Sequence, residues 1–169
     1  ISEVFIRLQS EQNLVAAIVA GAVAAVVGAV IWAVVTVVTE FQIGWMAVGV
    51  GFLVGYAVRA MGKGLNRPFG IVGGGSALFG CMLGNVLSGC GFVAKEANLT
   101  LHQVVTQVLF QPNIAFELLL ATFSPMDLLF YGIAVYEGYK FSFRQLDARE
   151  VAALSASLQP AGSPDIPSE

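Results

Sequence analysis

Arg59 and Glu137 carry opposite charges near the ends of two apolar stretches, and any chemistry inside a membrane would begin from such groups. Ionisable side chains within a membrane are costly and are often functional. Three tyrosines accompany them in the sequence: Tyr56, Tyr136 and Tyr139. The pattern predicts one of two arrangements. Either the charges pair in a polar pocket with these tyrosines, or the arginine extends to the lipid headgroups while the glutamate lies among interfacial aromatics.

The other polar residues of the apolar regions have simpler interpretations. Asn85 lies in the middle of an apolar stretch, where an amide is expected to hydrogen-bond a neighbouring helix. His102 is the single histidine and has no cysteine or carboxylate partner nearby, so no metal site is expected. Ser124, Pro125 and Asp127 form a helix-start signature, which explains the aspartate as a capping group.

Sequence motifs that would indicate a catalytic activity are missing. The chain contains no CxxC for thiol oxidation, no pair of histidines for haem, and no hydrolase or phosphate-loop motif. We therefore expect no catalytic residue, no metal and no cofactor, and a protein that is not an enzyme. One hypothesis of enzymatic function is kept, in which the outer connection acts on a lipid or quinone bound beside Glu117 and His102.

The composition is that of a protein that faces lipid. Hydrophobic residues make up 57% of the 169 residues and charged residues 11%, with a mean hydropathy of +0.79. A soluble domain carries roughly 25% charged residues. The net charge of -3 and the lack of a basic stripe give no support to a nucleic-acid partner. The expected fold is all-α and polytopic, and the lipid bilayer is the first expected partner.

Four apolar stretches predict a bundle of four transmembrane helices, at residues 14–38, 43–61, 69–93 and 126–143. A helix crosses the hydrocarbon core with about 20 apolar residues. The connection 95–123 is expected to form short helices in the outer interface, with Thr100 and Gln103 as a capping box. The alternative is that 114–123 extends the fourth span, with a bend at Pro125.

The basic residues predict the orientation of this arrangement. Four spans put both ends of the chain on one side, where seven of the eight basic residues fall: Arg7, Arg59, Lys63, Arg67, Lys140, Arg144 and Arg149. Only Lys95 falls on the other side. The positive-inside rule therefore predicts cytoplasmic termini in the inner (plasma) membrane. The segment 1–13 is expected to be amphipathic, and 144–169 to be a largely disordered tail with a weak amphipathic helix in its first half.

Small residues recur every four positions along three of the predicted spans. Helices in lipid associate through close backbone contact, which small residues permit. The expected helix-packing positions are Gly21, Gly51, Gly55, Gly80, Gly84 and Asn85.

Two further features of the third span are open to interpretation. The triplet Gly73–Gly75 is either a broken helix that lines a site or a thin patch beneath a bulky neighbour such as Trp32 or Phe52. Cys81 and Cys90 lie about 13 Å apart along a helix axis. That separation is beyond disulfide reach, so both are expected to be small packing residues.

Three segments resemble a family of uncharacterised small four-helix bacterial inner-membrane proteins: TEFQIGWMAVGVGFLVGYAVRAMGKG, GCMLGN and SPMDLLFYGIAVYEGYKFSFR. The resemblance covers about Gln12 to Arg144. Some members of that family carry an N-terminal zinc-ribbon-like segment, and this chain has no cysteine outside the third span to form one. The resemblance implies a bacterial membrane setting and no catalytic activity.

Two hypotheses of function without catalysis follow from these patterns. The first is a structural or accessory subunit that packs through its small-residue seams into a homo-oligomer or a larger membrane complex. The second is a small homo-oligomeric transporter or channel with a polar path near Arg59, Glu137 and Asn85.

Overall fold

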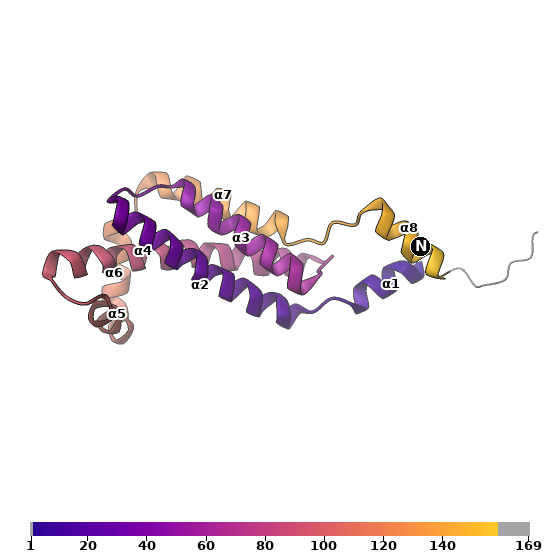
Figure 1. The fold of residues 1–169 in the computed structure, drawn as a ribbon, viewed down its shortest axis with the longest axis horizontal. Coiled ribbons are helices and arrows are strands. Elements are labelled where there is room, and N and C mark those ends of the chain that lie inside the picture. Colours follow the sequence, from indigo (N-terminus) through magenta and orange to yellow (C-terminus); the bar gives the residue numbers. More distant parts are fainter. Residues whose placement is uncertain (1, 159–169) are drawn as a thin grey trace, which may run out of the picture.

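The structure is a computed structural model that describes residues 2–158, which form eight α-helices and no strand. The helices are α1 (Ser2–Ser10), α2 (Leu14–Thr39), α3 (Trp45–Gly62), α4 (Arg67–Ala97), α5 (Leu101–Phe110), α6 (Pro112–Thr122), α7 (Pro125–Phe141) and α8 (Ala148–Leu158). Figure 1 shows α2, α3, α4 and α7 lying side by side, with α5 and α6 at one end and α1 and α8 at the other. We call these the α5–α6 end and the α1–α8 end.

Three helices are long and apolar enough to cross a membrane. They are α2, α3 and α4, with 26, 18 and 31 residues and mean hydropathies of 2.8, 1.4 and 1.7 over an 18-residue stretch. Their positions agree with the predicted spans 14–38, 43–61 and 69–93. The pair α5 and α6 reaches the same apolar character only when joined, and it is bent by 113°. The fold is therefore that of a membrane protein with three, or up to four, spanning elements.

Helix α7 occupies the place of the predicted fourth span, 126–143, and is 17 residues long. Its start has the predicted cap: the Ser124 side chain accepts from the Met126 N–H, and the Ser124 N–H donates to Asp127 Oδ2 at 2.8 Å. Pro125 occupies the first turn, where its missing N–H leaves no bond unmade. This capping box, predicted from the sequence, is confirmed.

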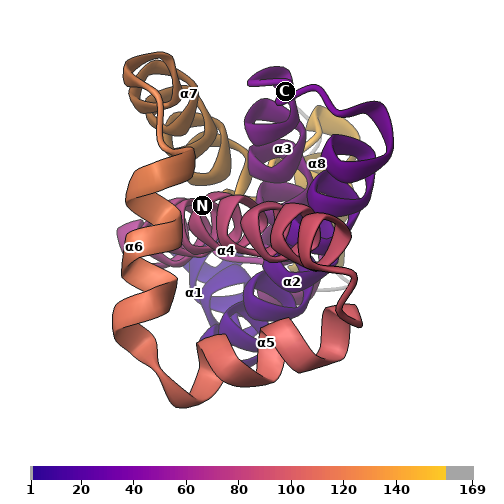
Figure 2. The same ribbon diagram turned by 90° about the vertical axis from the view of Figure 1, so that its left-hand side faces the viewer.

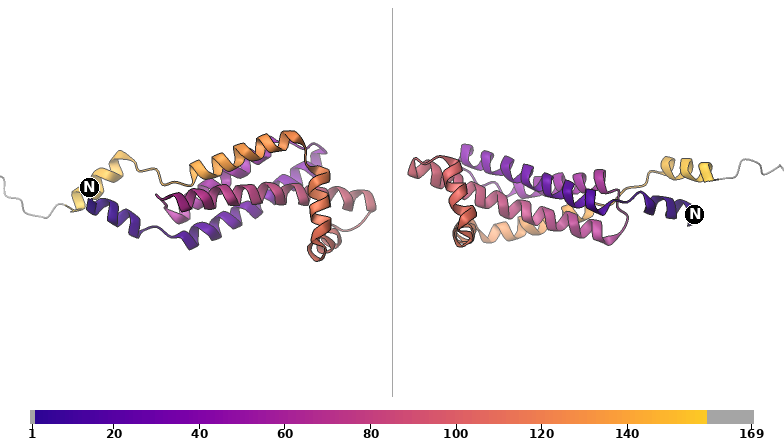
Figure 3. Two further views of the ribbon diagram at one scale, coloured as in Figure 1. Left: turned by 180° about the vertical axis from the view of Figure 1, so that it is seen from behind. Right: turned by 90° about the horizontal axis from the view of Figure 1, so that it is seen from below.

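The connection 95–123 contains two short helices, α5 and α6, after the last turn of α4. The predicted capping box of α5 is confirmed, since the Thr100 N–H donates to Gln103 Oε1 at 3.1 Å. Helix α6 does not extend α7: it ends at Thr122 and lies across the end of the bundle (Figure 3). Figure 2 shows α5 and α6 at this end beside α4, where Val104 and Val108 of α5 bury against Cys90 and Ala94. The alternative of one bent span is therefore not observed.

Helix α2 exposes large apolar side chains and buries small ones, as expected for a helix that faces lipid. Val19 and Val23 are 57% and 58% exposed, whereas Ala17, Ala25 and Ala29 are fully buried. In water this distribution would leave large apolar surfaces unprotected, but lipid tails are as apolar as valine. Helix α2 therefore faces the interior mainly with small residues and Trp32, and its valines and isoleucines mostly face outward.

Glycines lie where the long helices approach most closely. A Cβ on Gly51 would stand 2.6 Å from the Ala134 carbonyl oxygen of α7, and one on Gly80 would stand 3.2 Å from the Ala25 carbonyl oxygen. In both cases the neighbouring atom belongs to the backbone of another helix and cannot rotate away as a side chain can. A larger residue would therefore push the helices apart. The other predicted packing glycines are also buried, each against another helix: Gly21 by Ser76, Gly55 by Phe141, and Gly84 by Trp32.

The triplet Gly73–Gly75 lies inside an unbroken helix, since α4 runs from Arg67 to Ala97. Of the two alternatives, the broken helix is therefore wrong. The neighbour of Gly73 is neither of the bulky residues given as examples, Trp32 and Phe52, but Gly138 and Ser142 at the end of α7. A Cβ on Gly138 would lie 2.7 Å from the Gly73 carbonyl oxygen, while Gly75 faces open space. The triplet lets α4 and α7 meet backbone to backbone.

Helices α1 and α8 lie side by side beyond the bundle, with Leu8 only 2% exposed (Figure 1). Arg144 joins them: its guanidinium pairs with Glu11 at 2.9 Å and with Glu150. The hydrogen bond from Arg144 lowers the pKa of Glu11. The expected helix in the first half of the tail is observed as α8, and the stretch 159–169, expected to be disordered, lies outside the described residues.

Candidate functional site

A set of hydrogen-bonded polar side chains, three of them buried and one exposed, lies near the α5–α6 end of the bundle. We call it the polar cluster and define it as Gln42, Asn85, Asp127 and Tyr131. Asn85, Asp127 and Tyr131 are 0%, 4% and 6% exposed. Gln42 lies in the turn between α2 and α3, Asn85 in α4, and the other two are one turn apart on α7. The cluster therefore draws on three separate segments of the chain.

Gln42 is the hub of the cluster. The two N–H bonds of its Nε2 are shared among three acceptors: Asn85 Oδ1 at 3.1 Å, Asp127 Oδ2 at 3.3 Å and the Thr122 carbonyl oxygen at 3.2 Å. One turn residue is thus bonded to α4, to α7 and to the end of α6. These bonds fix how the α2–α3 turn sits on the rest of the bundle.

Asn85 continues the chain of hydrogen bonds toward the interior. Its Nδ2 donates to the Tyr131 hydroxyl at 2.6 Å, and that hydroxyl donates to the Cys81 carbonyl oxygen at 3.2 Å. The Trp32 ring of α2 stands edge-on to Tyr131, with centroids 6.4 Å apart. The prediction that Asn85 bonds another helix is therefore confirmed, with Tyr131 of α7 as one partner.

The side chains of the polar cluster hydrogen-bond helices to one another. Asp127 Oδ2 already accepts from Ser124 N and from Gln42 Nε2. Within residues 2–158, no three His, Cys, Asp or Glu side chains are grouped so that they could hold a metal ion. Cys81 and Cys90 are both free and buried. The cluster joins helices, and it offers neither an acid–base pair nor a set of metal ligands.

The predicted pocket around Arg59 and Glu137 lies near the α1–α8 end, and the structure shows no ion pair between these two residues. The ion pairs within the described residues are Lys95–Glu40, Arg144–Glu11 and Arg144–Glu150. Arg59 instead lies over the ring of Tyr56, 5.9 Å from its centroid. Glu137 is half-buried, and its backbone carbonyl borders Gly55.

The tyrosines expected in that pocket contact other partners. Tyr136 lies beneath Lys140 with 5.5 Å between the ammonium and the ring centroid, and Tyr139 packs edge-on against Phe143. At the opposite end Phe41 and Trp45 are 73% and 70% exposed. Aromatic side chains at both ends of the bundle are typical of the two interfaces of a membrane.

The remaining singled-out residues lie at the surface of the α5–α6 end. His102 and Glu117 are both exposed, and His102 Nδ1 lies 3.0 Å from the Thr100 hydroxyl. Gln42 and Tyr131 are the members of the polar cluster that the sequence reasoning missed. The i, i+4 spacing of Asp127 and Tyr131 places both on one face of α7 and could have indicated Tyr131. A glutamine in a turn carries no such signal.

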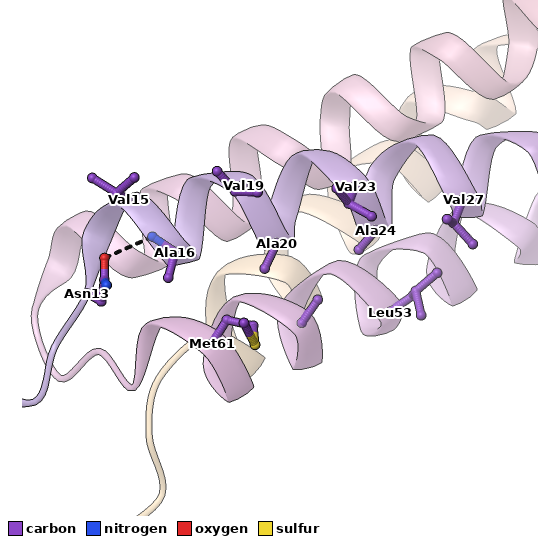
Figure 4. Close-up of a pocket in the computed structure, with 11 residues that line it drawn as sticks. Asn13, Val15, Ala16, Val19, Ala20, Val23, Ala24, Val27, Leu53 and Met61 are labelled. Carbon is purple, nitrogen blue, oxygen red and sulfur yellow. Dashed lines mark hydrogen bonds between the residues drawn. The ribbon is translucent and has the colours of Figure 1, made fainter.

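A second candidate site is an apolar groove between α2 and α3, on the surface of the bundle. It has a volume of about 710 Å³. In Figure 4 the alanines of α2 lie along this groove, and Leu53 and Met61 of α3 form its other wall. It is open along its length, unlike the filled interior of the bundle. Its lining is apolar except for Asn13 at one end.

The reversed side-chain distribution, the aromatic ends and the buried polar connection together define a helical membrane protein. No protein-family model, no curated protein and no solved structure matches the chain.

Proposed function

We propose that this is a non-enzymatic, four-span protein of the bacterial inner membrane that acts as a structural or accessory subunit. It would associate with a second copy or with other membrane proteins. The observation that carries the proposal is the open apolar groove of about 710 Å³ between α2 and α3. The polar cluster supports it as well, because its groups are engaged in joining helices.

The proposal takes α7 as the fourth span and α5 with α6 as helices in the outer interface. An even number of spans is supported by the contact between α1 and α8, which lie at the same end of the bundle (Figure 3). Two helices that pack on each other must be on one side of the membrane. The seven basic residues at this end support a cytoplasmic location for both.

A labelling experiment tests this topology. In a chain with Cys81→Ala and Cys90→Ala, we expect Ser10→Cys and Ser155→Cys to react with an impermeant maleimide only from the cytoplasmic side. Thr106→Cys in α5 should react only from the opposite side, because α7 would then cross the membrane. All three positions are exposed, so access is set by topology. Labelling of Thr106→Cys and Ser155→Cys from one side would contradict the four-span arrangement.

The transporter hypothesis receives less support. A path would have to connect Asn85 near one end of the bundle with Arg59 and Glu137 near the other. The interior between them is filled by apolar side chains: Val50, Val54, Val58, Ala77 and Ala134, each no more than 3% exposed. This apolar core separates Asn85 from Arg59 and Glu137, so the three polar residues do not form one continuous lining.

Extraction with a polymer that keeps native lipid around the protein tests the proposed function. We expect the 17.8 kDa chain to be recovered in assemblies that contain more than one polypeptide. Mass measurement of the discs and identification of the proteins in them give the readout. Recovery of single chains, without a second copy or another membrane protein, would contradict the proposal.

A further inference from the structure

Two buried polar atoms of α2 have no hydrogen-bond partner among residues 2–158. They are Nε1 of Trp32 and Oγ1 of Thr36, and the two residues are 0% and 1% exposed. A buried polar group without a hydrogen bond costs free energy, and lipid tails cannot supply the bond. Buried polar groups of native proteins are bonded either to the protein or to ordered water. These two atoms therefore indicate a small polar occupant inside the bundle.

The hydroxyl of Thr36 differs from four other hydroxyls inside the helices. Those of Thr39, Ser88, Thr106 and Thr122 donate to the carbonyl oxygen four residues earlier, at 2.7 or 2.8 Å. This bond is open to any threonine in a helix through one of its two common rotamers. Thr36 does not make it, so its hydroxyl is available to a group outside the backbone of α2.

The indole of Trp32 lies against the polar cluster. Its ring covers Gly84 of α4, where a Cβ would lie 3.1 Å from the nearest ring carbon, and it stands edge-on to Tyr131 of α7. The indole N–H can donate a hydrogen bond but cannot accept one. Its partner must therefore carry a lone pair, which excludes a cation as the occupant.

Trp32 and Thr36 are one turn apart on the same face of α2. Side chains at this spacing begin about 5 to 6 Å apart at Cβ. An oxygen atom that bonds both groups at ordinary lengths of about 2.8 to 3.0 Å joins atoms that are up to about 6 Å apart. The spacing of the two residues thus suits a bridge made by a single oxygen.

We propose that one water molecule is bound inside the bundle between Trp32 and Thr36. The water accepts from Trp32 Nε1–H and bonds the Thr36 hydroxyl, which can both donate and accept. Both residues are shielded from lipid, so neither a headgroup nor an acyl chain reaches them, and two polar partners are enough to hold a water. The site lies in the interior, so it does not depend on the proposed function.

A crystal structure grown from a lipid mesophase, at a resolution that shows ordered waters, tests the site directly. We expect one water peak within about 3.2 Å of both Trp32 Nε1 and Thr36 Oγ1. Thr36→Ser keeps the hydroxyl and should keep the peak, whereas Thr36→Val has nearly the same shape without the hydroxyl and should lose it. Thr39→Val is the matched control in the same helix and should keep the peak, because the Thr39 hydroxyl bonds its own helix.

The indole N–H signal in a nuclear magnetic resonance spectrum gives a second readout. The chain has two tryptophans, and Trp45→Phe identifies the signal of Trp32. A hydrogen bond to oxygen moves an N–H proton downfield, whereas an N–H that points at the face of the Tyr131 ring is moved upfield. We expect a downfield signal in the wild type that moves upfield in Thr36→Val and stays in place in Thr39→Val.

The stability of Thr36→Val tests the same bridge by the direction of its change. If the Thr36 hydroxyl were unbonded, valine would stabilise the fold by removing a buried polar group. If a water bridges the two side chains, valine leaves the indole N–H without its partner. We therefore expect Thr36→Val to unfold at a lower SDS concentration than the wild type.

Three results would each overturn the inference. They are a wild-type structure without the water peak, a wild-type Trp32 signal that is already upfield, and a Thr36→Val variant more stable than the wild type. The first two are measured on the unaltered chain, so they decide the matter even if a variant does not fold.

Discussion

Gly73→Ala is expected to lower the free energy of unfolding by about 1 to 3 kcal/mol relative to Gly75→Ala. A Cβ on Gly73 would overlap the carbonyl oxygen of Gly138 and the Ser142 hydroxyl, so α4 and α7 would have to separate. Overpacking of this kind costs about 1 to 3 kcal/mol. Gly75 faces open space. The preference of a helix for alanine over glycine, about 1 kcal/mol, is common to both variants and cancels in the comparison.

The two variants are matched because they carry the same substitution two residues apart in one helix. Unfolding of the purified protein by SDS in mixed micelles, followed by far-UV circular dichroism, gives both free energies. Equal stabilities would show that the backbones of α4 and α7 are not in close contact at Gly73, contrary to the structure.

The long helices could be predicted from the sequence because their signals are local. Uninterrupted apolar residues mark α2 and α4, and the caps at Thr100 and Ser124 mark the starts of α5 and α7. The neighbours of Gly73 could not be predicted in the same way. A glycine in a helix indicates that another part of the chain packs closely against it. Which residue that is depends on how the whole helices are arranged. Here it is another glycine, Gly138, 65 residues later in the chain.

The hydrogen bonds of the polar cluster could also be predicted only in part. Asn85 was expected to bond another helix because an amide in lipid needs a partner. Its bond to Gln42 could not be predicted, since a polar residue in a turn is ordinary and normally faces water. The Arg59 and Glu137 pair rested on similar positions near the ends of their helices. Two residues at a similar depth in the membrane can still point their side chains in different directions. In the structure Arg59 contacts the ring of Tyr56 and does not pair with Glu137.

The groove between α2 and α3 could not be predicted from the sequence, because small residues occur on more than one face of α2. Helix α2 has two adjacent rows with period four, one from Ala17 through Gly21 and Ala25, the other from Ala16 through Ala20 and Ala24. The first row is fully inside the bundle, and the second borders the groove. Composition is nearly the same in both rows, so only the placement of α3 and α4 decides which row is buried and which one borders the groove.

Asn85→Ala is expected to lower the free energy of unfolding by about 2 kcal/mol, since it removes the bonds to Gln42 and Tyr131 and leaves a cavity. Asn113→Ala is the control, because Asn113 is exposed on α6 and its loss should change stability by less than about 0.5 kcal/mol.

A double-mutant cycle with Tyr131→Phe isolates the bond between Asn85 and Tyr131. Interhelical hydrogen bonds in membranes contribute about 0.6 kcal/mol on average and up to about 1.7. We expect a coupling near the upper value, because both groups are almost fully buried and 2.6 Å apart. Strictly additive effects of the two substitutions would mean that the amide and the hydroxyl do not bond, and the polar cluster would then not be what joins α4 to α7.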